Sequence, residues 1–137
     1  MKHDVTLVIG VPGSGKSWVC EQLLDRYHYV ANDMHKTNPA AAIIAAATEE
    51  GYNPVLSDVP FGERKLKDKL EKRGLVVRCV FIREDAATIR ERYEQRSGKA
   101  ANSVILHRIT GLSKRAVEWG CFQGTSTEVL EFLRWVD

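Results

Sequence analysis

The chain has 137 residues, of which 44% are hydrophobic, a length that suits one well-packed domain and is too short for two ordinary ones. Its 20 basic residues nearly balance its 18 acidic residues, so the composition excludes a strongly basic nucleic-acid coat and leaves room for a local basic patch. The three cysteines form no CxxC pair and the four histidines are scattered, which favours neither a disulfide framework nor a structural zinc site.

Short runs of β-branched residues alternate with helical patterns along the chain. The predicted strands are 5–10, 27–32, 54–58 and 75–82, with a shorter one around 121–122. The predicted helices are 16–26, 39–50, 63–73, 85–97 and 103–119, and a last helix is expected to be capped near Ser126 or Thr127. In the first helix, Val19, Leu23 and Leu24 are expected to share the apolar stripe. Repeated strand-helix-strand units favour a three-layer α/β/α domain around a parallel sheet of four to five strands, with its site beyond their carboxyl ends.

Residues 10–17, GVPGSGKS, match the pattern G-x-x-x-x-G-K-[ST] of a phosphate-binding loop. Glycines let backbone N–H groups turn toward an anion, and the following helix adds its positive end. We expect the Lys16 ammonium to reach the β- and γ-phosphates of a nucleotide and the Ser17 hydroxyl to ligate Mg²⁺. A glycine-rich turn with an incidental lysine is the alternative, which the flanking strand and helix disfavour. The residues expected to bind the nucleotide here are Gly10, Pro12, Gly13, Ser14, Gly15, Lys16, Ser17 and Trp18.

Two acidic residues lie at the carboxyl ends of the second and third predicted strands, Asp33 and Asp58. A carboxylate at Asp33 can take the proton of an attacking hydroxyl and align it with the γ-phosphorus, although a cap or turn role is the alternative. Asp58 is expected to assist Mg²⁺ and to border the substrate, unless it merely ends the strand before Pro60. Lys36 either holds a substrate phosphate or is a solvated lysine.

Arginines at positions 92 and 96, with Lys99, form one cationic stripe on the predicted helix 85–97 and its continuation. No carboxylate within the helix lies at pairing distance from Arg92 or Arg96, so an anion outside the helix is implied. Arginines that close over a nucleotide stabilise charge on the transferring phosphoryl group, which makes both residues candidates for catalysis and nucleotide binding. A tertiary salt bridge to another element is the alternative.

Together these features resemble the kinase domain of the phage-type polynucleotide kinases. The resemblance covers about residues 5–114 and rests on GVPGSGKSW, NDMHK, SDVPFGERKL, and RERYEQRSGKA followed by VILHR. It implies one P-loop kinase domain over 1–137 with a helical lid at about 90–102, ATP and Mg²⁺ as donor and cofactor, and Asp33 as general base. It also implies that Lys36 contacts the acceptor's phosphate and that Arg92 and Arg96 grip the donor phosphates.

The resemblance departs from the family's pattern on the acceptor side. Lys36 stands where the family has an arginine, and Met34 where it often has a second aspartate. The acceptor therefore stays open between a 5′-hydroxyl end of DNA or RNA and the hydroxymethyl group of a modified base, as in the related phage 5-hydroxymethyluracil DNA kinases.

Two further functions are compatible with the sequence: a nucleoside monophosphate or small-molecule kinase, and a non-catalytic nucleotide-binding switch. No apolar run approaches the ~18 residues of a membrane span, and no signal peptide is evident. We therefore expect a soluble cytoplasmic protein, in the host cytoplasm if the protein is viral, with nucleic acid as its substrate and no membrane partner. The oligomeric state is left open.

Overall fold

A five-stranded parallel sheet forms the centre of the molecule. The computed structural model describes residues 4–11, 13–31, 39–48, 54–59, 64–98, 114 and 116–136. The strands are β1 (Val5–Ile9), β2 (His28–Val30), β3 (Val55–Val59), β4 (Val77–Ile82) and β5 (Phe122–Gly124). All neighbours pair in parallel in the order β2-β3-β1-β4-β5, so β1 is the central strand. This arrangement confirms the predicted α/β fold class and its sheet.

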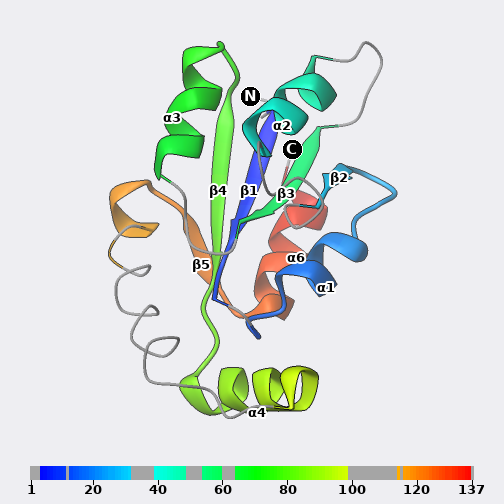
Figure 1. Cartoon of the computed structure of the whole chain (residues 1–137), viewed down its shortest axis with the longest axis vertical. Helices are drawn as coiled ribbons and strands as arrows, with labels where there is room; N and C mark the ends of the chain where they lie inside the picture. Colours follow the sequence, from blue (N-terminus) through cyan, green and yellow to red (C-terminus); the bar gives the residue numbers. More distant parts are fainter. Residues whose placement is uncertain are drawn as a thin grey trace.

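Helices cover both faces of the sheet (Figure 1). They are α1 (Lys16–Glu21), α2 (Pro39–Ala47), α3 (Arg64–Lys72), α4 (Ala86–Ser97) and α6 (Ser126–Trp135). Helices α1 and α6 pack against each other on one face, and α2 and α3 pack together on the other. Helix α4 lies beyond the carboxyl ends of the strands, at the bottom of Figure 1. Across the residues that the structure places, no helix is long and apolar enough to cross a bilayer.

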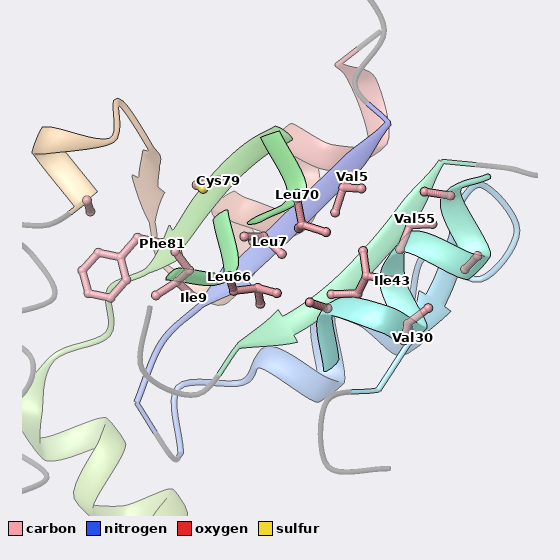
Figure 2. Packing of buried hydrophobic residues seen from close by; sticks show 14 of the residues in the cluster. Val5, Leu7, Ile9, Val30, Ile43, Val55, Leu66, Leu70, Cys79 and Phe81 are labelled. Carbon is pink, nitrogen blue, oxygen red and sulfur yellow. The ribbon is translucent and has the colours of Figure 1, made fainter. Parts of the chain in front are cut away.

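Two apolar cores flank the sheet because successive side chains of a strand point to opposite faces. Val5, Leu7 and Ile9 of β1 face the core beneath α2 and α3, as Figure 2 shows, whereas Val8 faces the core beneath α1 and α6. All four side chains are at most 3% exposed. The continuous apolar run of β1 thus reflects a strand that is buried on both faces.

Helix α1 is shorter than predicted. It ends at Glu21, and the N–H groups of Leu23 and Arg26 donate to carbonyl oxygens three residues back, which is the spacing of tight turns. Leu23 stays fully buried, but Leu24 is 58% exposed, so its predicted place on the apolar stripe is wrong. The tighter winding rotates Leu24 away from the core.

Helix α6 begins with a capping box at Thr125, one residue before the predicted cap. The Thr125 hydroxyl accepts a hydrogen bond from the Glu128 N–H, and the Glu128 carboxylate accepts one from the Thr125 N–H at 3.0 Å. The hydrogen bond from the Thr125 N–H to the carboxylate, followed by the interaction of the carboxylate with the Thr125 side chain, lowers the pKa of Glu128. Most of the predicted helix 103–119 lies outside the described residues. Within this range, residues 114 and 116–118 are described as helical.

We expect Thr125→Ala to lower the free energy of unfolding by about 1 kcal/mol, the usual value of a lost N-cap. Urea denaturation followed by circular dichroism measures this change. Thr127→Ala is the matched control: it removes a hydroxyl from the same helical turn that makes no hydrogen bond within the described structure, and it should shift stability by less than about 0.5 kcal/mol. Equal losses in the two variants would contradict the cap assignment.

Candidate active site

The carboxyl ends of the strands bring the chemistry-bearing residues to one edge of the sheet, as expected for a parallel α/β fold. The phosphate loop follows β1, Asp58 lies near the end of β3, Glu84 follows β4, and Ser126 follows β5. Pro12, Asp33 and Lys36 lie outside the described residues, so their predicted roles stay predictions.

The phosphate loop has no space for side chains at its glycines. Gly13 and Gly15 have φ of 89° and 101°, a region that L-residues rarely adopt. A Cβ on Gly13 would lie 2.9 Å from the carbonyl oxygen of Ile89 in α4, and one on Gly10 would lie 2.4 Å from the Ser14 hydroxyl. Ser14 is fully buried, and its hydroxyl has no hydrogen-bond partner in the described structure. A tight backbone cradle with an unsatisfied donor fits a bound phosphate.

The Lys16 ammonium is held inside the loop. Its Nζ donates to the carbonyl oxygens of Gly10 at 2.8 Å and Val11 at 3.2 Å. Burial lowers the pKa of Lys16 to about 8; Asp58 opposes this shift and the Arg96 guanidinium adds to it. A desolvated cation gains more from an anion than an exposed one does, because little water screens the pair.

Ser17 and Asp58 form an oxygen-rich corner beside the loop. The Ser17 hydroxyl lies 3.4 Å from the Asp58 Oδ2, and the Tyr29 hydroxyl hydrogen-bonds with both residues. Burial, followed by the neighbouring Cys20 and then Asp58, raises the pKa of Tyr29. Hydroxyl and carboxylate oxygens suit Mg²⁺, which usually keeps several waters and substrate phosphates as its other ligands. Among the described residues, no group of three or more His, Cys, Asp or Glu that could hold a metal ion is found.

Arg92 reaches from α4 to the phosphate loop, and its partner is not within its own helix. Its Nη1 donates to the Ser14 carbonyl oxygen at 3.1 Å and lies 3.7 Å from the Glu84 carboxylate. The sequence predicted an anion outside the helix for Arg92 and Arg96. For Arg92, the Glu84 carboxylate is one such anion. Arg96 forms no ion pair among the residues placed by the structure, and it lines a cavity together with Lys16 and Arg92.

Two cavities adjoin at Arg92. The smaller, of about 180 Å³, contains the predicted phosphate-binding residues and is lined by Gly13, Gly15, Lys16, Ser17, Trp18, Arg92 and Arg96. The larger, of about 420 Å³, is lined by Gly15, Trp18, Arg92, Ser126 and Thr127. Trp18 is 46% exposed and borders both. The structure thus brings seven of the predicted donor-side residues together around one cavity and adds a second cavity next to it.

Sequence reasoning missed Glu84, Ser126, Thr127 and the position of Tyr29 beside Asp58. The rule applied to Asp33 and Asp58, a polar residue at the carboxyl end of a strand, also identifies Glu84 and Ser126 when it is widened to the second residue after β4 and β5. Tyr29 offers no comparable signal because it lies within its strand, where an aromatic residue is ordinary.

The solved structures that resemble this chain share its fold at low sequence identity. The tunicamycin resistance protein of Deinococcus radiodurans superposes with a TM-score of 0.73 and 16% identity, over 95% of this chain and 92% of its own. A gluconokinase from Sinorhizobium meliloti 1021 superposes with a TM-score of 0.55 and 23% identity, over 81% of this chain and 75% of its own. The chain has a P-loop kinase fold. Its sequence matches no protein-family model and no curated protein.

Gly13→Ala tests the contact between the loop and α4. Alanine adopts this φ only with strain, and its methyl group would press on the α4 backbone, so we expect a loss of stability about 1 to 3 kcal/mol beyond the strain alone. Gly74→Ala supplies the strain term, because Gly74 has φ of 81° but open space around its Cβ position. Similar losses for the two variants in urea denaturation would show that α4 does not seat on Gly13.

Asp58→Asn tests the oxygen corner. The amide lacks the negative charge that holds a divalent cation or its waters, so we expect the Mg²⁺ concentration for half-maximal ATP binding to rise roughly tenfold or more. Calorimetric titrations of ATP at graded Mg²⁺ measure this. Asp68→Asn removes an exposed carboxylate from α3 and should leave the Mg²⁺ dependence unchanged. An unaltered dependence in Asp58→Asn would exclude Asp58 from the metal site.

Proposed function

We propose that this protein is an ATP-dependent kinase that transfers the γ-phosphoryl group to a hydroxyl of a nucleic acid. The observation that carries the donor half is the 180 Å³ cavity, in which Lys16, Arg92 and Arg96 surround a glycine-rich backbone cradle. Three cations around a phosphate-sized space suit phosphoryl transfer, which depends on positioning and charge stabilisation more than on covalent chemistry.

On this proposal, the residues that line the smaller cavity have different roles in binding the nucleotide donor. The loop backbone and Lys16 bind the β- and γ-phosphates, while Arg92 and Arg96 stabilise charge on the transferring group. Ser17 and Asp58 would hold Mg²⁺, which supplies further neutralisation of phosphate charge. Because the Lys16 ammonium already points into the loop, binding exchanges its two carbonyl contacts for phosphate oxygens.

The acceptor half rests on Asp33 and Lys36 in the NDMHK segment and on the polynucleotide kinase resemblance. Asp33 would accept the proton of the attacking hydroxyl, and Lys36 would contact a phosphate of the acceptor. Both residues come after β2 in the chain, and in the sheet β2 is separated from β1 by β3 alone, an order that supports the proposal. The hydroxyl is either a 5′ end or the hydroxymethyl group of a modified base.

A small-molecule acceptor is the second candidate. The resemblance to a gluconokinase favours it, since that protein's name gives a small hydroxy acid as its acceptor. Within P-loop kinase folds the donor machinery is shared and the acceptor side varies, so the fold alone does not choose between the two.

The acceptor is identified by supplying γ-labelled ATP with a panel of hydroxyl compounds. We expect label in 5′-hydroxyl oligonucleotides or in DNA that contains 5-hydroxymethyluracil, and none in gluconate, nucleoside monophosphates or other small alcohols. Label in the small molecules alone would replace the first candidate by the second. Slow ATP hydrolysis that no acceptor stimulates would indicate a nucleotide-binding switch.

Asp33→Asn tests the general base. The amide cannot take a proton, so turnover should fall by about 10² to 10⁴, while the affinity for ATP stays within about twofold because the donor cavity is intact. Labelled transfer gives turnover, and calorimetry gives affinity. Asp25→Asn, at an exposed turn before β2, is the control and should match the wild type in both. Wild-type turnover in Asp33→Asn would remove Asp33 from the mechanism.

A further inference from the structure

Glu84 connects three elements at the edge of the two cavities. It lies in the link between β4 and α4, and its side chain is only 10% exposed. One carboxylate oxygen accepts hydrogen bonds from both the N–H and the hydroxyl of Ser126, each at 2.8 Å, and lies 3.7 Å from the Arg92 Nη1. Three donors from the start of α6 and from α4 thus converge on this oxygen.

The phosphate loop also holds the same Arg92 nitrogen. It donates to the Ser14 carbonyl oxygen of the phosphate loop at 3.1 Å. A Cβ on Gly15 would lie 3.4 Å from this nitrogen and 3.2 Å from the Ser126 Cβ, so the junction has no spare volume. Loop and carboxylate together fix one nitrogen of the guanidinium, and the side chain, 42% exposed, borders both cavities.

The charge of Glu84 needs an explanation, because a carboxylate beside a phosphate site repels the ligand. The two Ser126 donors are neutral, and a neutral amide oxygen can also accept from them, although a carboxylate accepts more strongly. The first turn of α6 already has an acidic residue, Glu128, and a side-chain cap, Thr125, so the helix dipole does not require a further anion. Among these partners Arg92 is the one with an opposite formal charge, so it gains the most from the full negative charge of Glu84.

We propose that Glu84 is a positioning residue that fixes Arg92 as the partition between the phosphate cavity and the larger cavity. An arginine side chain has many rotamers, and holding one of them before the ligand arrives removes an ordering cost from binding. The proposal rests on the proposed function in one respect: it takes the phosphates of a nucleotide to occupy the smaller cavity and the rest of the nucleotide to extend past Arg92 into the larger one.

A double-mutant cycle measures whether Glu84 acts through Arg92. Glu84→Gln keeps an oxygen for Ser126 and removes the charge, and we expect it to weaken Mg·ADP binding about threefold to tenfold in calorimetry. In the Arg92→Met background the same change should alter affinity by less than about twofold. Glu91→Gln is the charge control and should bind ADP like the wild type, because Glu91 is exposed on α4 and its carboxylate accepts a hydrogen bond from the Gln95 amide.

A second readout needs no ligand. The ¹⁵N relaxation of the Arg92 Nε–Hε group reports how rigid the side chain is in the free protein. We expect a rigid signal in the wild type and in Glu91→Gln, and a mobile one in Glu84→Gln at unchanged melting temperature. A mobile Arg92 in the wild type, or one as rigid in Glu84→Gln, would overturn the proposal.

The outcomes separate this proposal from the function on which it rests. An equal loss of affinity with and without Arg92 would reduce Glu84 to a support of α6 and overturn its positioning role. If the wild type fails to bind Mg·ADP, the proposed function fails, and the relaxation measurement alone then decides whether Glu84 orders Arg92.

Discussion

The seating of α4 on the phosphate loop governs the geometry of the whole site. Gly13 meets the α4 backbone so closely that the carbonyl oxygen of Ile89 would lie 2.9 Å from any added Cβ. Ile89 is itself 1% exposed and belongs to the core beneath α2 and α3. The backbone of α4, the helix that carries Arg92 and Arg96, therefore packs against the loop, and its Ile89 side chain packs into the core beside the sheet. The contact between α4 and the loop therefore determines where both arginines lie.

Burial sets the electrostatics of the donor cavity. Burial lowers the pKa of Lys16 to about 8, and Asp58 on the neighbouring strand β3 opposes this shift. Arg92 is paired with Glu84, whereas Arg96 has no ion pair among the described residues and its positive charge further lowers the pKa of Lys16. Before any ligand arrives, the cavity thus concentrates cations that repel one another, and an anion relieves that repulsion. This is an electrostatic arrangement directed at a ligand more than at stability.

The sequence predicted the parts of the molecule that local pattern determines. The apolar runs of β1 and β4 and the glycine-lysine motif at 10–17 suffice for the sheet and the loop, because burial on both faces and a tight phosphate turn each leave a local signature. Helix ends were harder to predict from the sequence. Helix α1 is followed by tight turns from residue 22 on, and their tighter winding exposes Leu24. The partner of Arg92 lies eight residues away in the link after β4, and such tertiary pairing leaves no periodic trace in sequence.

The capping box of α6 has a consequence for how a ligand lies in the two cavities. Thr125, Glu128 and Glu84 already satisfy N–H groups of the first turn of α6 and place negative charge there. At the other end of the site, α1 begins at Lys16 after the N-cap residue Gly15, with no side-chain cap and no acidic residue in its first turn. The electrostatic environment therefore differs between the two ends of the site. It favours anionic groups beside the start of α1 and disfavours them beside the start of α6. A molecule with one charged and one uncharged end has a single favourable direction in which to enter.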